Sequence, residues 1–296
     1  MGNLHQKSQL MDRITLPVTE TQMVVDVILK AVAPCTIFVL GYHYQNQSAV
    51  SLLSPATVGS TTVHHFDLLV FSRQHFPNGA SNIANTIAEK SGHRVTVSVL
   101  LHKVTDLTTQ KASQQWFFDQ VLRKGQRLHL DTMAPPYLLN SAPIRDVTGD
   151  RAYWLKCVGV AQFNLQAAGD SAQLEVTLCK IALLHTASSQ IALGLLRVFL
   201  GYTPNEFGLK YLLQLCGQFT ALPTQLFKPS TPEAVHRFKM LCAPPAMLHH
   251  WTRLTASEQD FLWLLAACQE FLRLATDLVT LELERLEPTL TISLSS

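Results

Sequence analysis

Charged side chains are scarce in this chain of 296 residues. They make up 15% of the sequence, whereas soluble domains usually carry about a quarter. The formal net charge is only +2, so no strong long-range field favours nucleic acid, which stays open only as a locally bound partner. Hydrophobic residues make up 47% of the sequence, which predicts folded structure throughout and excludes extensive disorder. A chain of this length is expected to form two domains.

The sequence also lacks metal-binding cysteine motifs, and we expect neither a leader sequence nor a membrane span. The six cysteines are widely spaced without any C-x-x-C pair, and most lie in apolar runs, which predicts a reducing, cytoplasmic environment. The first 13 residues contain no apolar h-region, so we expect no signal peptide. The longest uncharged apolar segment, Ile181 to Leu196, is expected to be too short and too polar to cross a membrane.

Short apolar runs alternate with helical patterns in the first half of the chain. We expect a first helix opened by a capping box at residues 19–22, further helices at 82–91 and 109–124, and strands at 35–40, 64–71, 95–101 and 127–130. Glycines follow the second and third helices as stop signals. Residues 42–63 are polar and rich in turn formers, which predicts a long loop. The alternation favours a small α/β domain with a mixed sheet.

Only helical patterns follow a proline-containing segment at residues 131–146. Helices are expected at about 150–168, 171–200 and 205–219, with two more opened by capping boxes at 230–233 and 255–258. The last one is expected to end near Leu286, before Pro288. The predicted fold class is therefore α+β, with an α/β domain at 15–132, a linker at 133–147, a helical bundle at 148–288 and a tail at 289–296.

Motifs in both halves resemble one bacterial family, which fuses a minimal nucleotidyltransferase domain to a C-terminal HEPN helical domain. In the first half, the resemblance rests on Gly41 at a strand end and on the strand from His65 to Val70. In the second half, it rests on residues 182–187 and on the run from Leu196 to Pro204. The resemblance covers roughly Val25 to Glu287. It implies a site for ATP and Mg²⁺ in the first domain, and pairing through the second.

The carboxylates that nucleotidyl transfer requires are largely missing. Mg²⁺ takes oxygen ligands, so the reaction needs two or three carboxylates on adjacent strands. Here the family's first aspartate aligns with His65 and only Asp67 remains, so Asp67 is the catalytic and metal-binding candidate, with His65 as a second catalytic candidate. The strand at 95–102 contributes no carboxylate, and Thr96 and Ser98 are its polar interior positions. His65 favours Zn²⁺ over Mg²⁺, so we interpret the strand as a relic in which Asp67 bonds an internal partner.

The glycine–serine pair that lets phosphates approach in the family is Gly41-Tyr42 here, which predicts a bulky ring in the phosphate path. On the helical side, His185 and Ser189 lie on a helix that the resemblance places along a nucleotide groove. The competing interpretation of His185, a buried histidine bonded to a neighbouring helix, is favoured. The candidate nucleotide-binding residues are Gly41, Tyr42, His185, Ser189, His249, His250 and Arg253.

Active HEPN ribonucleases carry an arginine, four to six residues, then a histidine on a late helix. The late helices here do not fit that order, so Arg253 with the His249–His250 pair is only a weak ribonuclease candidate. We therefore interpret the chain as a catalytically degraded member that binds a nucleotide, or a protein such as a second copy of itself. The alternative is an active Mg²⁺-dependent enzyme that transfers a nucleoside monophosphate from ATP to a protein, RNA or small acceptor through Asp67.

Overall fold

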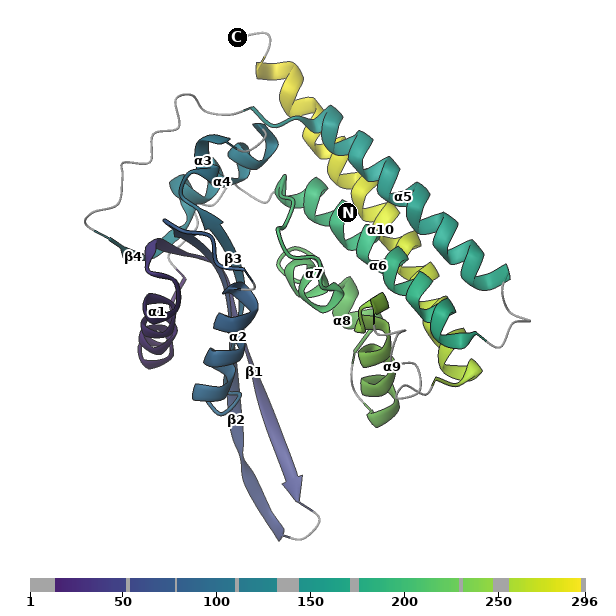
Figure 1. Ribbon diagram of the computed structural model, residues 1–296, viewed down its shortest axis with the longest axis horizontal. Coiled ribbons are helices and arrows are strands. Elements are labelled where there is room, and N and C mark those ends of the chain that lie inside the picture. Colours follow the sequence, from purple (N-terminus) through teal and green to yellow (C-terminus); the bar gives the residue numbers. More distant parts are fainter. Residues whose placement is uncertain are drawn as a thin grey trace, which may run out of the picture. The chain divides into compact units, whose positions relative to one another are not determined.

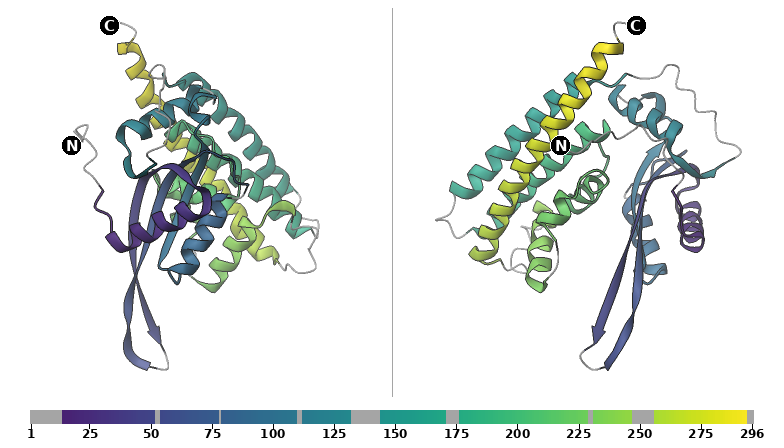
Figure 2. Two further views of the ribbon diagram at one scale, coloured as in Figure 1. Left: turned by 60° about the vertical axis from the view of Figure 1, so that its left-hand side comes forward. Right: turned by 180° about the vertical axis from the view of Figure 1, so that it is seen from behind.

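The computed structural model describes residues 14–51, 54–77, 79–109, 112–131, 144–170, 176–228, 231–246 and 256–293. The chain divides into two compact units (Figures 1 and 2). The sheet unit comprises Met1–Lys111 and Phe118–Ala142, and the helical unit comprises Ala112–Phe117 and Pro143–Ser296. One unit holds a four-stranded mixed sheet and the other is helical, so the predicted α+β class is confirmed at this level.

The sheet has the strand order β3-β2-β1-β4. Its strands are β1 (Pro34–Ser51), β2 (Ser54–Ser72), β3 (Val95–Lys103) and β4 (Gln126–Leu130). β1 pairs antiparallel with β2 and β4, whereas β2 and β3 run parallel. Because β2 and β3 are parallel, a crossover must connect them, and it contains α2 (Gly79–Lys90).

The loop predicted at residues 42–63 is wrong, because β1 and β2 form a long hairpin (Figure 1). Their pairing continues to Ser51 opposite Ser54, well beyond the point where β3 begins to pair, at His64 opposite Val95. The segment is polar and rich in turn formers, but it also contains several threonines and valines that favour strands. Along this segment, β1 and β2 are hydrogen-bonded to each other, which explains why a polar sequence adopts an extended conformation.

Two helices cover one face of the sheet and form its apolar core. They are α1 (Val18–Val32) and α2, and the core combines their valines and isoleucines with side chains of β1, β2 and β3. The capping box predicted at residues 19–22 is wrong, since α1 begins one residue earlier, at Val18, with Pro17 as its N-cap. Gly92, after α2, has a φ of 58°, which confirms the predicted glycine stop.

The opposite face of the sheet is partly covered by the second half of a helix. The predicted helix at 109–124 is observed as α3 (Asp106–Thr109) and α4 (Ala112–Lys124). Phe118 of α4 packs edge-on against Phe71 of β2 and against His102 of β3, with ring centroids 5.2 Å and 5.0 Å apart. The part of this face that lies nearer the hairpin carries polar side chains.

The helical unit is built on three long helices, α5 (Val147–Asp170), α6 (Thr177–Leu200) and α10 (Glu258–Ser293), which pack against one another (Figure 1). The shorter helices are α7 (Leu209–Cys216), α8 (Leu222–Leu226) and α9 (Pro232–Cys242). The predicted helix at 205–219 is thus shorter than expected, and α8 was not predicted. The predicted end of the last helix before Pro288 is wrong, because the helical backbone continues to Ser293.

Capping residues explain where two of these helices begin. The Thr231 side chain accepts a hydrogen bond from the Ala234 amide, so α9 is capped one residue after Ser230, the first residue of the predicted box. At the start of α10, Ser257 and Asp260 bond reciprocally, so the capping box lies two residues after the predicted one. Glu258 instead pairs with the buried Lys180 of α6 at 3.2 Å.

Among the described residues, α6 is the one helix that is long and apolar enough to cross a membrane by length and composition. The apolar segment singled out in the sequence, Ile181 to Leu196, is part of this helix, which has 24 residues and is longer than the segment itself. In the structure, 61% of its most apolar window is buried. A core helix of a bundle has the same composition, since it is surrounded by apolar side chains.

Candidate functional site

A β-bulge in β1 determines which side chains share the polar face of the sheet. Val39 pairs with Leu68 and Gly41 pairs with Asp67, so Leu40 is an additional residue in β1. A Cβ atom placed on Gly41 would lie 3.0 Å from Asp67 Oδ2, which shows that Gly41 faces Asp67. The residue after it, Tyr42, consequently points to the opposite, helix-covered face.

The Tyr42 side chain lies on the helix-covered face of the sheet. Its ring packs against Phe66 with centroids 5.1 Å apart, and a 2.7 Å hydrogen bond joins its hydroxyl to His64 Nδ1. Burial raises the pKa of the Tyr42 hydroxyl, and the charge of nearby Glu20 raises this pKa further. Tyr42 thus lies on the opposite face from Asp67, because of the bulge at Leu40, which the period of the strand does not reveal.

Five polar side chains on the other face form what we call the His65 cluster: His43, His65, Asp67, Thr96 and Ser98. The parallel register of β2 and β3 sets His65 opposite Thr96 and Asp67 opposite Ser98. His65 Nδ1 lies 2.8 Å from the Thr96 hydroxyl, and its Nε2 lies 3.0 Å from Ser98 Oγ and 3.3 Å from Asp67 Oδ1. The ring of His43, on β1, lies 4.7 Å from that of His65.

The hydrogen bonds of His65 make the cluster a set of fixed donors and acceptors. With the proton on Nε2, His65 donates to Asp67 and Ser98 and accepts from Thr96 through Nδ1. Burial lowers the pKa of His43, and the neighbouring His65 lowers it further, while Asp67 acts in the opposite direction. His43 is therefore held neutral near pH 7, so it can accept or donate a hydrogen bond to a ligand.

The cluster does not fit a two-metal magnesium site. Asp67 is buried and bonded to His65, as the sequence interpretation expected of a relic aspartate. The other carboxylates that might assist it have different partners, since Asp106 bonds His102 at 3.2 Å and Asp119 bonds Arg123 at 2.7 Å. Across the described residues, no group of three His, Cys, Asp or Glu side chains is arranged to hold a metal ion. Two Mg²⁺ ions need more oxygen ligands than Asp67 provides.

His185 has the structural role that the sequence analysis favoured. It lies on α6, is buried, and donates a 2.9 Å hydrogen bond from Nδ1 to the backbone carbonyl of Leu241 on α9. Burial lowers the pKa of His185, and the bond to Leu241 offsets this only in part. Ser189, one turn later, has a buried hydroxyl oxygen without a hydrogen-bond partner among the described residues. His249, His250 and Arg253 lie outside the described residues.

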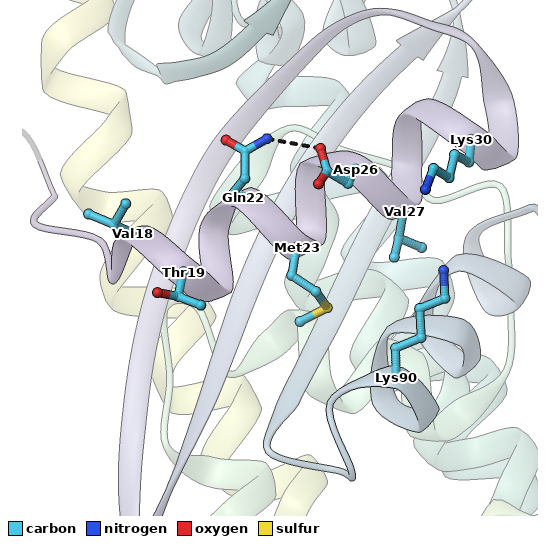
Figure 3. A pocket seen from close by; sticks show the side chains of 8 residues that line it. All are labelled: Val18, Thr19, Gln22, Met23, Asp26, Val27, Lys30 and Lys90. Atoms are coloured by element: carbon cyan, nitrogen blue, oxygen red, sulfur yellow. Dashed lines mark hydrogen bonds between the residues drawn. The ribbon is translucent and has the colours of Figure 1, made fainter.

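Two depressions of the sheet unit lie apart from the His65 cluster, and sequence reasoning did not find them. Figure 3 shows the first, of about 510 Å³, which is lined by α1 and by Lys90 at the end of α2. Its floor is apolar, Gln22 bonds Asp26 at its rim, and Lys30 and Lys90 lie at one end. The second, of about 530 Å³, adjoins it and includes His64 and Arg94. Both lysines occupy last turns of helices, where positive charge is stabilising without a ligand.

No protein-family model matches the chain. A search of the curated proteins also finds no match. The resemblance to the fusion of a nucleotidyltransferase domain with a HEPN domain thus remains a hypothesis based on the motifs in the sequence.

Proposed function

We propose that the protein binds a nucleotide on the polar face of its sheet and that its nucleotidyl-transfer chemistry has lapsed. The observation that carries this proposal is the state of Asp67, which is buried and bonded to His65, with no metal-binding group of side chains around it in the part of the chain that the structure describes. Transfer through a pair of metal ions requires a second carboxylate. The proposal includes membership of the fusion family as a degenerate member, on the strength of the motifs alone.

The remaining groups of the His65 cluster favour a ligand with hydrogen-bonding edges, such as a base or a ribose. Thr96, Ser98 and His43 offer hydroxyl and imidazole groups on one face, beside the Asp67 carboxylate that lies over Gly41. Neutral donors and acceptors do not need a metal ion to recognise such a ligand. We therefore expect nucleotide binding that is independent of Mg²⁺.

Calorimetric titration of ATP into the full chain, with and without Mg²⁺, tests this proposal. We expect dissociation constants that agree within about twofold, because Asp67 alone cannot hold the metal between itself and the triphosphate. Replacing His65 with alanine should weaken binding about tenfold, as hydrogen bonds to the ligand are lost or misplaced. Tyr42→Phe is the control, since Tyr42 faces the other side of the sheet and its change should leave the affinity unchanged.

The same titration distinguishes this proposal from the alternative of an active, Mg²⁺-dependent nucleotidyltransferase. ATP binding that requires Mg²⁺ and disappears in Asp67→Asn would support an active nucleotidyltransferase and contradict the proposal. Absence of ATP binding under both conditions would contradict a nucleotide-binding role and leave protein binding as the function. The ribonuclease alternative depends on His249, His250 and Arg253, outside the described residues, and within them Arg237 of α9 is engaged by Asp260 at 2.8 Å.

A second role, pairing with another copy of the chain, is supported by the outer face of α5. Leu155, Gly159 and Phe163 follow one another at intervals of four residues, so they lie in one stripe along the helix. Phe163 is 70% exposed, and a Cβ atom on Gly159 would meet no atom within 4 Å. Between Arg151 and Asp170, Lys156 is the only charged residue of α5. The same stripe on a second copy could therefore pack against it with little charge repulsion.

Light scattering coupled to size-exclusion chromatography tests the pairing. We expect the wild-type chain to elute as a dimer at about 50 μM, and Phe163→Glu to elute as a monomer because it buries a charge in the interface. Leu281→Glu is the matched control, since Leu281 is 64% exposed on α10 and lies outside the stripe. A wild-type monomer at this concentration, or equal effects of the two changes, would exclude α5 as the interface.

A further inference from the structure

A buried cluster of two arginines and one aspartate lies where α5 begins and α6 ends. Asp150, in the first turn of α5, has no exposed surface, and its two carboxylate oxygens are bonded by different arginines. Arg145 Nε lies 3.0 Å from Oδ2, and Arg197 Nε, from the last turn of α6, lies 2.5 Å from Oδ1. Their side chains are only 9% and 13% exposed, respectively.

The cluster contains more positive than negative charge. Two guanidinium groups share one carboxylate, which leaves a formal charge of +1 in a largely buried position. Arginines keep their charge in proteins, so the excess cannot be relieved by losing a proton. The nearest acidic residue in sequence, Asp146, is exposed and accepts a hydrogen bond from the Gly149 amide instead. A buried charge without a full counter-charge is costly, and an anion would offset that cost.

The arginines also have donors left for such an anion. Arg145 uses one terminal nitrogen to donate to the carbonyl of Val198, and Arg197 bonds Asp150 through Nε. Both side chains keep a small part of their surface open to solvent, 9% for Arg145 and 13% for Arg197, where a ligand can approach. Aromatic rings hold both guanidinium groups in place, with Trp116 at 4.8 Å from Arg145 and Tyr153 at 5.8 Å from Arg197.

We propose that Arg145 and Arg197 form a binding site for a phosphate group, either as the free ion or as the end of a phosphomonoester. Guanidinium groups are complementary to phosphate oxygens in charge and in hydrogen-bond geometry. Because aromatic rings already hold both guanidinium groups in place, the two side chains lose little conformational entropy when a phosphate binds. The site belongs to the helical unit and is distinct from the His65 cluster. It assigns a ligand-binding role to a cluster that also holds the ends of α5 and α6 together.

Thermal unfolding of the full chain in inorganic phosphate or in chloride, at equal ionic strength, tests the site. We expect saturable stabilisation by phosphate, with a rise in Tm of about 2–5 °C at saturation. In Arg197→Gln this rise should disappear. Arg273→Gln is the matched control, because Arg273 is an exposed arginine of α10 paired with Glu270, and its change should leave the phosphate effect intact. Equal phosphate effects in wild type and Arg197→Gln would overturn the proposal, as would the absence of any effect in wild type.

Asp150→Asn separates ligand binding from a purely structural role. It lowers the Tm in chloride, but it raises the charge of the cluster to +2, so the additional stabilisation by phosphate should grow. If that variant does not fold, Arg197→Lys replaces it, since lysine keeps the positive charge but lacks the two terminal nitrogens of the guanidinium group. In Arg197→Lys, the stabilisation by phosphate should fall by half or more. Phenyl phosphate distinguishes the sources: tighter binding than inorganic phosphate indicates a phosphomonoester, and equal binding indicates the free ion. An unchanged phosphate effect in both variants would contradict the assignment.

Discussion

Replacement of Asp150 by asparagine should lower the free energy of unfolding by about 3–5 kcal/mol, which would make it one of the most damaging single changes in the helical unit. The carboxylate is fully buried and is the counter-charge of both Arg145 and Arg197. Asparagine has a similar volume, so the packing around position 150 is kept while both guanidinium groups lose their anionic partner. The cost is therefore electrostatic and not a cavity effect.

Urea denaturation followed by circular dichroism measures this change as a shift of the midpoint at constant slope. Asp277→Asn serves as the control, because Asp277 also pairs with an arginine but lies on the exposed surface of α10, where removal of a charge should leave stability within experimental error. Replacing Arg145, Asp150 and Arg197 together by apolar residues should cost much less than Asp150→Asn, since no unpaired charge stays buried. A loss below about 1 kcal/mol in Asp150→Asn would show that solvent or the end of α6 already balances the arginines.

The Asp150 cluster also shows which kind of feature sequence reasoning could not find. Arg145 lies next to the start of α5, whereas Arg197 lies 47 positions after Asp150, on another helix. No local pattern pairs residues at that separation, because the pairing depends on how α5 and α6 pack. Local signals were more informative: the cap of α9 was predicted to within one residue, and the glycine stop at Gly92 was predicted correctly, since both act within a single turn of chain.

The candidate site on the sheet shows the same limit. The sequence indicated that Asp67 would have an internal partner and that Thr96 and Ser98 were the polar positions of β3, and the register brings these residues together around His65. The side on which Tyr42 lies depends on one additional residue in β1, which reverses the alternation of side chains after it. A bulge of this kind depends on the pairing of two strands, so the period of one strand does not reveal it.

Close packing of α5 against α6 leads to the second large expected effect, at Gly194. A Cβ atom on Gly194 would lie 2.8 Å from Cζ3 of Trp154 on α5 and closer still to Cε3, and 3.3 Å from the Cβ of Cys157. Trp154 is itself buried, so its ring cannot swing away into solvent. We expect Gly194→Ala to lower the free energy of unfolding by about 1–3 kcal/mol, as the helices must move apart or the ring must leave its rotamer.

The same substitution at Gly159 should have the opposite sign. Gly159 lies on α5 where an added Cβ would meet nothing within 4 Å, so alanine there gains helix propensity without a clash and should stabilise by about 0.5–1 kcal/mol. Urea denaturation of both variants at a concentration where the chain is monomeric isolates this difference from any effect on pairing. Because propensity favours alanine equally in both helices, a destabilised Gly194→Ala beside a stabilised Gly159→Ala can only reflect the contact with Trp154. If both variants were stabilised, α5 and α6 would have to lie farther apart at this point than the structure shows.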